Sequence, residues 1–246
     1  MNTQTGSPAV AFQTSKPERA AYGVYFFGQS IIYMLLLNFH QIFLTDQGIT
    51  AAAVATIFLV AKIWDAVNDP IFGVIIDRSK PKRGKFLPWI RWSIIPIAIT
   101  TVLIFAMPAS ISLEMKMIWA MVAYLLWDLT YTFTDAPIFA LTTAMTENIQ
   151  ERTVIISLGR VGGMIGTSTI ALGVPLLYPK IGWLATALAI SVIGIIAKYP
   201  VTNLAQERVL SRKENAPSLG DIWKYLKGNK YLLIFYASMV VYSLTN

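Results

Sequence analysis

Acidic, amide and basic side chains interrupt one of the most apolar parts of the chain. Lys62, Asp65, Asn68 and Asp69 lie in KIWDAVNDP, residues 62–70, between the apolar runs TAAAVATIFLVA and IFGVII. Residues three and four apart share one face of a helix, so all four side chains project to the same side. Two carboxylates and an amide supply hard oxygen ligands, which suit sodium, lithium or a proton rather than a soft transition metal. The pattern indicates a cation-binding face.

A simpler interpretation is a buried ion pair between Lys62 and Asp65. Charges inside a bilayer are costly, so they face a partner or a water-filled cavity. The ion pair leaves Asp69 and Asn68 unexplained, and two acids less one lysine leave a net negative charge. A bound cation or proton would complete that charge, and the sequence therefore favours the cation site.

The elements that must hold these residues are long apolar helices. The chain is 55% hydrophobic and 13% charged, whereas soluble domains carry about a quarter charged residues. Its apolar blocks are about twenty residues long, enough for a helix to span a bilayer, and too long for the alternating strands of a β-barrel. The predicted fold class is an all-α polytopic membrane protein. The predicted segments run from Tyr22 to Leu44, Ala52 to Ile76, Phe86 to Met107, Met115 to Leu141, Val154 to Tyr178, Trp183 to Val201, and Tyr231 to the end.

Charge and composition restrict the function. Lysine and arginine gather in the amino-terminal tail and the even-numbered connections, which predicts a cytoplasmic amino terminus in a multi-pass protein of the cytoplasmic membrane. The net charge of +7 then reflects topology and not a nucleic-acid surface. The chain has no cysteine and one histidine, His40, so thiolate chemistry and a histidine metal cluster are excluded. No nucleophile–base pair is evident, and we expect no enzyme activity.

The organisation resembles one half of a two-bundle transporter. We expect a cytoplasmic tail at 1–20, not a signal peptide, then a six-helix transmembrane bundle at 21–203, a charged cytoplasmic linker at 204–229, and the start of a seventh helix at 230–246. In this interpretation the carboxy-terminal bundle is a missing partner. The alternative is a non-transporting or truncated membrane protein that needs a second half.

Two motifs carry a family resemblance. Residues 62–90, KIWDAVNDPIFGVIIDRSKPKRGKFLPWI, resemble the signature of the glycoside–pentoside–hexuronide cation symporters, the melibiose-permease-like group of the major facilitator superfamily. Residues 125–137, LLWDLTYTFTDAP, are similar to the fourth-helix motif of that family. The resemblance covers nearly all of residues 20–203 and implies symport of a sugar or glycoside with Na⁺ or H⁺ by alternating access. It implies no cofactor beyond the coupling ion.

The resemblance implies roles for residues of the second and fourth helices. Asp65, Asn68 and Asp69 would coordinate the coupling cation, with a further oxygen from Thr132. Lys62 stands where melibiose permease has arginine, and lysine cannot make the bidentate contacts that arginine makes.

The implied sugar site draws on several helices. The Asp135 carboxylate would accept charge-assisted hydrogen bonds from sugar hydroxyls, although it could instead cap a helix break before Pro137. Asp128 lies on roughly the same face and is a weaker candidate. Gln29 and Ser30 replace the lysine and aspartate of melibiose permease, and Phe139 replaces a tryptophan that stacks on the sugar. The full predicted sugar site comprises Asp135, Tyr131, Phe139, Arg160, Gln29, Ser30 and Lys62.

The second connection resembles the superfamily loop that forms a cytoplasmic gate, with Gly73, Asp77, Arg78 and Arg83 as its predicted residues. The same charges also serve as a positive-inside anchor. A final alternative keeps the fold and changes the cargo to a lipid or another solute.

Overall fold

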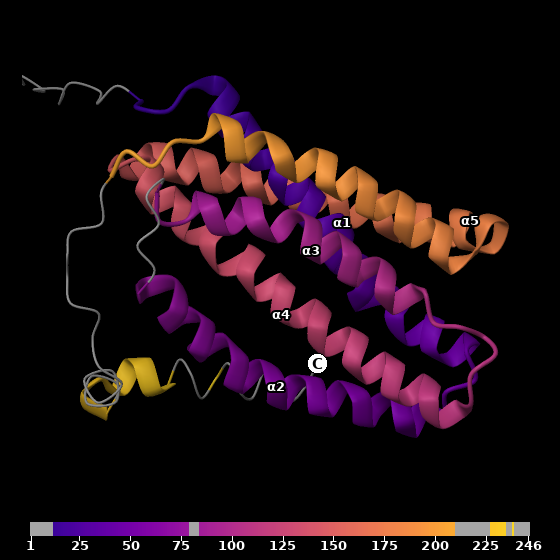
Figure 1. The fold of residues 1–246 in the computed structure, drawn as a ribbon. Coiled ribbons are helices and arrows are strands. Elements are labelled where there is room, and N and C mark those ends of the chain that lie inside the picture. Colours follow the sequence, from indigo (N-terminus) through magenta and orange to yellow (C-terminus); the bar gives the residue numbers. More distant parts are fainter. Residues whose placement is uncertain (1–11, 79–83, 210–226, 235–237, 239–246) are drawn as a thin grey trace, which may run out of the picture. The chain divides into compact units, whose positions relative to one another are not determined.

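The computed structural model describes residues 12–78, 84–209, 227–234 and 238, with the side chains of several residues within 65–78 outside the description. The chain divides into two compact units, Met1–Leu210 and Ser211–Asn246. The first unit contains α1 (Lys16–Asp46), α2 (Ala51–Arg78), α3 (Leu87–Phe105), α4 (Leu113–Met145) and α5 (Ile149–Leu204) (Figure 1). In the second unit, residues 230–234 are helical. Helices joined by short connections make up the described chain, which confirms the predicted all-α class.

The helix α5 consists of two arms that meet at Gly182. Gly182 has φ 83° and ψ 164°, a conformation that interrupts a helix and that glycine adopts without steric cost. The predicted spans 154–178 and 183–201 therefore correspond to the two arms of one element. The five elements of the first unit thus hold all six predicted spans of the bundle.

Short polar residues fix where the helices begin. Ser15 caps α1 in a reciprocal capping box with Glu18, so α1 begins at Lys16, before the predicted apolar segment at Tyr22. Ser112 accepts from the Met115 backbone at the start of α4, and Asn148 accepts from the backbone of Gln150 and Glu151 at the start of α5. Each of these side chains satisfies backbone N–H groups that have no partner within the helix.

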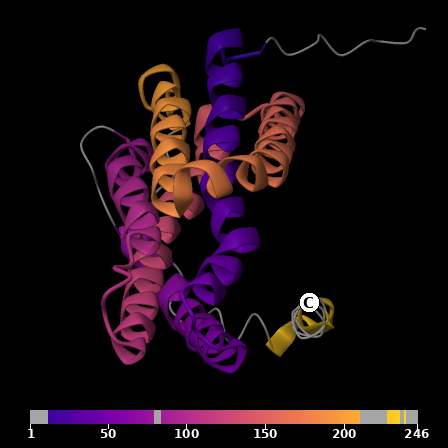
Figure 2. The ribbon, with the colours of Figure 1, turned by 90° about the vertical axis from the view of Figure 1, so that its right-hand side faces the viewer.

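The helix α1 lies between the two arms of α5 (Figures 1 and 2). Glycines permit this close approach. A Cβ atom added at Gly162 would lie 2.0 Å from the backbone oxygen of Gly23, and one added at Gly194 would lie 2.6 Å from Ile32. The small residues of GGMIG in the first arm thus allow backbone-to-backbone contact, as small residues do at other membrane helix interfaces.

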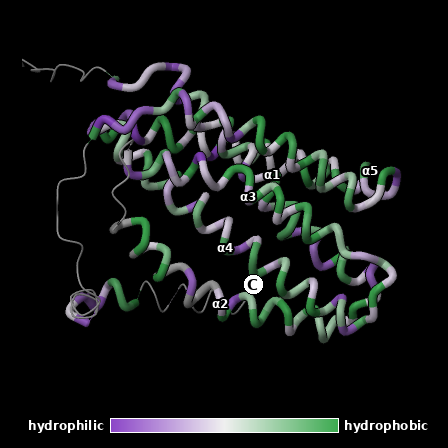
Figure 3. The backbone as a smooth tube through the Cα atoms, in the orientation of Figure 1, coloured by the Kyte–Doolittle hydropathy of each residue, from purple (hydrophilic) through white to green (hydrophobic). Residues whose placement is uncertain are grey.

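Apolar residues dominate most of the helical length (Figure 3). Among the described residues, α1, α3 and α5 are long and apolar enough to cross a membrane, and α2 contains a shorter apolar stretch, Ala51–Trp64. Many large apolar side chains point outward, such as Leu172, which is 72% exposed. α4 is absent from the spanning group, and it is the helix that carries Asp128, Asp135 and a series of threonines.

The segment after α5 joins the helix ends of the first unit. The Glu207 carboxylate accepts from the backbone N–H groups of Phe86 and Leu87 at the start of α3, at 2.8 Å each. Arg208 pairs with Glu18 of α1 at 2.9 Å, and its backbone N–H donates to Ala144 of α4 at 2.8 Å. The first residues of the predicted linker 204–229 therefore belong to the helical unit, which extends to Leu210.

Candidate functional site

Three polar side chains meet where α1 faces α4. Gln29 Nε2 donates to Asp135 Oδ1 at 2.5 Å and to the Tyr131 hydroxyl at 3.4 Å. The Tyr131 hydroxyl in turn donates to Asp135. Gln29 is 4% exposed, and its Oε1 atom finds no donor among the described residues. We call Gln29, Tyr131 and Asp135 the α1–α4 triad.

A second polar group joins α2 to α4 one turn away. Asn68 Nδ2 donates to Asp128 Oδ2 at 3.2 Å and to Thr132 Oγ1 at 3.4 Å, and all three residues are buried. Asp128, Tyr131, Thr132 and Asp135 are spaced so that they follow one stripe of α4. The stripe therefore places an amide–carboxylate–hydroxyl group directly beside the α1–α4 triad. Asp128, ranked behind Asp135 from the sequence, is the acid that Asn68 contacts.

An aromatic stack flanks the triad. The rings of Tyr33 and Tyr131 are stacked with centroids 5.1 Å apart, and Trp127 stacks on Tyr131 at 4.9 Å. The Trp127 indole N–H donates to Thr101 Oγ1 at 3.0 Å, which fixes the indole in the bundle. Tyr131 therefore presents its hydroxyl to the acid while its ring packs against Tyr33 and Trp127, whose own ring centroids lie 6.4 Å apart.

Sequence reasoning missed Lys198, which lies in the second arm of α5. Its side chain is 1% exposed, and Nζ lies 3.3 Å from Thr134 Oγ1 and 4.9 Å from the centre of the Tyr25 ring. Thr134 is the neighbour of Asp135, whose carboxylate interacts electrostatically with Lys198. The sequence does contain a signal, namely a lysine inside a predicted apolar span. A charge there costs free energy, so such a residue usually pairs with a partner or lines a functional cavity.

The structure places other predicted sugar residues away from the triad. Arg160 is exposed and forms no hydrogen bond or ion pair with the described part of the chain. Ser30 packs against Gly163 and Gly166 of α5, with its Cβ 3.0 Å from a Cβ added at Gly166. Phe139 is 55% exposed and contacts Phe26 edge-on at 5.3 Å. Lys62 is exposed on α2.

Several predicted residues lie outside the description. The side chains of Asp65 and Asp69 are not described, and neither are those of Asp77, Arg78 and Arg83. Gly73, the remaining predicted gate residue, lies within α2 with open space around it. Of the four predicted cation ligands, the structure therefore describes Asn68 and Thr132, and it brings them into contact. Within the described residues, no group of three histidine, aspartate or glutamate side chains could hold a metal ion.

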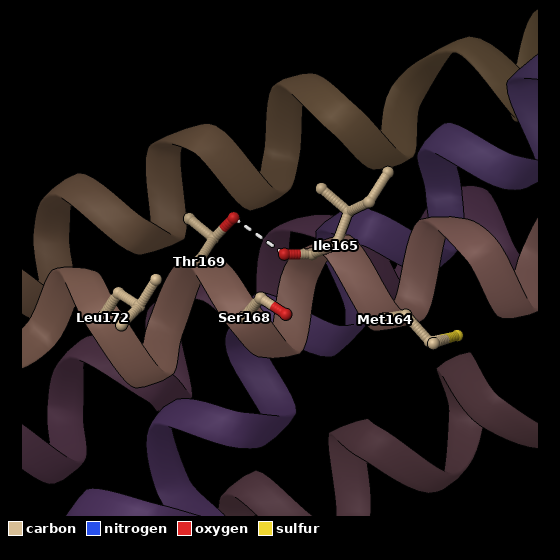
Figure 4. Close-up of a pocket in the computed structure, with 5 residues that line it drawn as sticks. All are labelled: Met164, Ile165, Ser168, Thr169 and Leu172. Carbon is tan, nitrogen blue, oxygen red and sulfur yellow. Dashed lines mark hydrogen bonds between the residues drawn. The ribbon is translucent and has the colours of Figure 1, made fainter.

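A hollow on the first arm of α5 is separate from these groups. Met164, Ile165, Ser168, Thr169 and Leu172 line it, with a volume of about 350 Å³ (Figure 4). The Thr169 hydroxyl already donates to the Ile165 carbonyl at 2.8 Å. The lining comes from one helix and contains no charged side chain.

Comparison with known proteins defines the class of the molecule. The chain belongs to the MFS/sugar transport protein family, whose model matches residues 21–245. It is 34% identical over 224 residues to the isoprimeverose transporter of Lactiplantibacillus pentosus, covering 86% of this chain and 46% of that protein. It is 32% identical to an uncharacterized symporter of Bacillus subtilis strain 168, covering all of this chain and 56% of the relative.

A putative glycoside/cation symporter of Escherichia coli K12 is 28% identical over 228 residues, covering 90% of this chain and 48% of that protein. The chain thus spans about half the length of the curated relatives it matches. The membership confirms the predicted family and the multi-pass membrane architecture. The family is one of transporters, in agreement with the prediction that the chain is not an enzyme.

Proposed function

We propose that this chain forms the amino-terminal half of a carrier that moves a sugar or glycoside across the cytoplasmic membrane together with a cation. The relatives include a transporter of isoprimeverose and a putative glycoside/cation symporter. The observation that carries the proposal is the contact of Gln29 with Asp135 across α1 and α4, at 2.5 Å. This contact puts a carboxylate, an amide and a phenol at one point of the bundle.

The triad has the chemistry of a sugar site. A carboxylate accepts strong hydrogen bonds from hydroxyl groups, and an amide can both donate and accept. Gln29 Oε1 is a buried acceptor without a donor among the described residues, so a sugar hydroxyl would satisfy it. The aromatic stack next to the triad supplies faces for a pyranose ring.

The neighbouring group suits a coupling cation. The Asp128 carboxylate and the Thr132 hydroxyl offer hard oxygens, and a half-turn of the Asn68 amide would add its carbonyl oxygen. Asp65 and Asp69 share the helix of Asn68, and the resemblance assigns them to the same role. A cation here would neutralise acids next to Tyr131 and Thr132, which are consecutive residues of α4, and so affect the triad directly.

The carrier would work by alternating access. Cation binding at α2 and α4 would reduce the negative charge, stabilise the sugar at the triad, and permit the loaded bundles to rock to the inward-facing state. A ligand shifts such an equilibrium only by its differential affinity for the two states. Cation affinity therefore has to depend on whether the sugar is bound. Residues of both groups lie on α4, and this helix connects the two sites.

Uptake by the complete protein encoded by the gene tests this function. Radiolabelled isoprimeverose, xylose, lactose and melibiose would be offered to cells or proteoliposomes, with and without a sodium gradient and with and without a proton gradient. We expect saturable uptake of at least one sugar, stimulated by one of the two gradients. Failure of every sugar to show saturable uptake would contradict the proposal, and uptake indifferent to both gradients would contradict cation coupling.

A further inference from the structure

The ammonium group of Lys198 is buried in the first unit, and no carboxylate among the described residues forms an ion pair with it. Within the described residues its partners are the Thr134 hydroxyl at 3.3 Å and the face of the Tyr25 ring at 4.9 Å. The ion pairs described in this unit join Arg19 to Glu151 and Arg208 to Glu18, at the ends of the helices. A lysine 1% exposed in a membrane bundle is costly, so its charge requires compensation nearby.

Glycine at position 28 leaves space for the Lys198 side chain between α1 and α5. A Cβ atom added at Gly28 of α1 would lie 3.0 Å from Lys198 Cγ and 2.8 Å from Ala197 Cβ. Any larger residue at position 28 would therefore push the lysine stem out of the interface. Glycine at 28 lets the stem pass between α1 and α5 toward α4, where the ammonium meets Thr134.

Hydrogen bonds around Thr134 have a fixed direction. Ser93 Oγ donates its only proton to the Ile90 carbonyl at 3.0 Å, so in its 2.7 Å contact with Thr134 it accepts. The Thr134 hydroxyl is thereby committed as a donor to Ser93 and is left to accept from Lys198. In the 3.3 Å contact the threonine oxygen is therefore the acceptor and the Lys198 amino group is the donor.

The carboxylate that this charge serves is Asp135. It follows Thr134 in the chain, it interacts electrostatically with Lys198, and it is the acid of the α1–α4 triad. Asp135 faces Gln29, while Thr134, on the adjacent position of the helix, faces α3 and the second arm of α5. The ammonium thus lies beside Thr134, on the face of α4 that neighbours the one carrying Asp135, and over Tyr25, one turn before Gln29 in α1.

We propose that Lys198 is a positioning residue for the sugar site: held by Thr134 and Tyr25, its ammonium acts as the counter-charge that keeps Asp135 ionised and oriented toward Gln29. This role rests on the proposed sugar function of the triad. It assigns a part in substrate binding to the sixth predicted span, which contributes no residue to the triad.

A double-mutant cycle tests the charge pairing without any sugar. The midpoint of thermal unfolding would be measured for the complete encoded protein and for Lys198→Met, Asp135→Asn and both together. We expect each single variant to unfold at a lower temperature, and the double variant to recover several degrees relative to Lys198→Met, because no uncompensated charge remains. Purely additive effects of the two changes would overturn the proposal. This result does not depend on whether the protein transports sugar.

Sugar uptake separates positioning from a merely structural role. For the sugar that the parental protein takes up, we expect Lys198→Met to raise KM at least tenfold with a smaller change in the maximal rate. Lys198→Arg, which keeps the charge, should retain part of the affinity, and Lys180→Met, which removes an exposed lysine of α5, should behave as the parental protein. An unchanged KM in Lys198→Met would overturn the proposal.

Thr134→Val provides a second variant where Lys198→Met does not fold. Valine keeps the volume of threonine and removes the acceptor of the ammonium, so KM should rise severalfold. A parental KM in Thr134→Val would contradict the proposal as directly as an unchanged KM in Lys198→Met.

Discussion

At the scale of single residues, the threonines of α4 illustrate how one residue type takes different tasks on different faces. Thr130 binds the Thr100 hydroxyl of α3 at 2.9 Å, whereas Thr132 accepts from Asn68 of α2 at 3.4 Å. Thr134 binds Ser93 and Lys198. Each hydroxyl forms a hydrogen bond to a neighbouring helix, and that of Thr132 belongs to the proposed cation group.

Replacing Thr132 by valine should weaken the response to the coupling cation. The change keeps the volume and removes one oxygen from the group around Asn68, and a hydrogen bond of this kind contributes about 1 kcal/mol. The cation concentration that gives half-maximal sugar uptake should therefore rise about fivefold to tenfold. Thr130→Val removes a comparable hydroxyl that binds α3, so it should leave this concentration unchanged. Equal responses of the two variants would argue against Thr132 as a ligand.

The sequence predicts a site residue when its type and spacing are enough to indicate its role. It does not predict one whose role depends on which residues become its neighbours in the folded bundle. Asn68, Thr132 and Asp135 are polar side chains inside apolar helices, and their spacing already places them on chosen faces. The role of Lys198 depends on a close approach of α1 and α5, which is set by Gly28 and Gly194 and is a property of the folded bundle. Arg160 shows the converse, since its span was predicted but its outward direction was not.

At the scale of elements, α1 depends on glycine to fit between the arms of α5. The first arm approaches so closely that a Cβ atom at Gly162 would lie 2.0 Å from the Gly23 backbone oxygen. Backbone atoms cannot move aside as the end of a flexible side chain can. The packing of these two helices therefore holds the α1 side of the triad in place.

Gly162→Ala should destabilise the bundle. The added methyl group must separate α5 from α1, and overpacking of this kind costs about 1–3 kcal/mol. The unfolding midpoint of the purified protein should fall by several degrees. Gly173→Ala is the matched control, because a Cβ atom there meets nothing within 4 Å. It should leave the midpoint equal or higher, since alanine favours the helix more than glycine does. A parental midpoint for Gly162→Ala would contradict the packing.

The order of helices followed from hydrophobic length, but their boundaries did not. A hydrophobic pattern detects the part of a helix that meets lipid or core. It does not detect polar first turns such as Lys16 to Ala21, which the Ser15 capping box adds to α1. Likewise, Glu207 and Arg208 look like ordinary linker charges in the sequence. Only the folded chain shows that they bind the ends of α1 and α3.

At the scale of the whole first unit, the helix ends predicted to face the cytoplasm gather at one end of the bundle. Glu151, in the first turn of α5 and ahead of the apolar segment that begins at Val154, is fully buried there. Its carboxylate accepts from the backbone of Gln13 at 2.9 Å and of Thr14 at 2.7 Å, and from the Thr146 hydroxyl at 2.7 Å. It therefore ties the residues before α1 to the α4–α5 connection.

The stability of this end should depend on acid pH. Burial alone would raise the pKa of Glu151, but the hydrogen bonds from Thr14, Thr146 and Gln13 outweigh it and hold the pKa at about 2. Because the folded-state pKa lies below the unfolded value of about 4.5, the ionised group stabilises the fold above pH 4.5, and this stabilisation is lost as the pH falls toward 2.

Chemical unfolding of the purified protein between pH 6 and pH 2 measures this effect. Glu151→Gln should unfold more easily at pH 6 and show a shallower loss of stability on acidification than the parental protein. Glu147→Gln, which changes an exposed carboxylate of the same connection, should follow the parental curve. A Glu151→Gln variant with the parental pH dependence would show that the buried carboxylate does not stabilise this end.

The central claim is that Asp135, held by Gln29 and Tyr131, binds the transported sugar, and the affinity of Asp135→Asn tests it most directly. Asparagine keeps the shape of aspartate and removes the charge, and hydrogen bonds to a charged group contribute about 1.5–3 kcal/mol. In the complete encoded protein, the KM for the transported sugar should rise about tenfold to hundredfold. Asp46→Asn should keep the parental KM, because Asp46 ends α1 four to five turns after Gln29 and its carboxylate accepts from Trp183 Nε1 at 3.0 Å. Sugar uptake by Asp135→Asn with the parental KM would contradict the account.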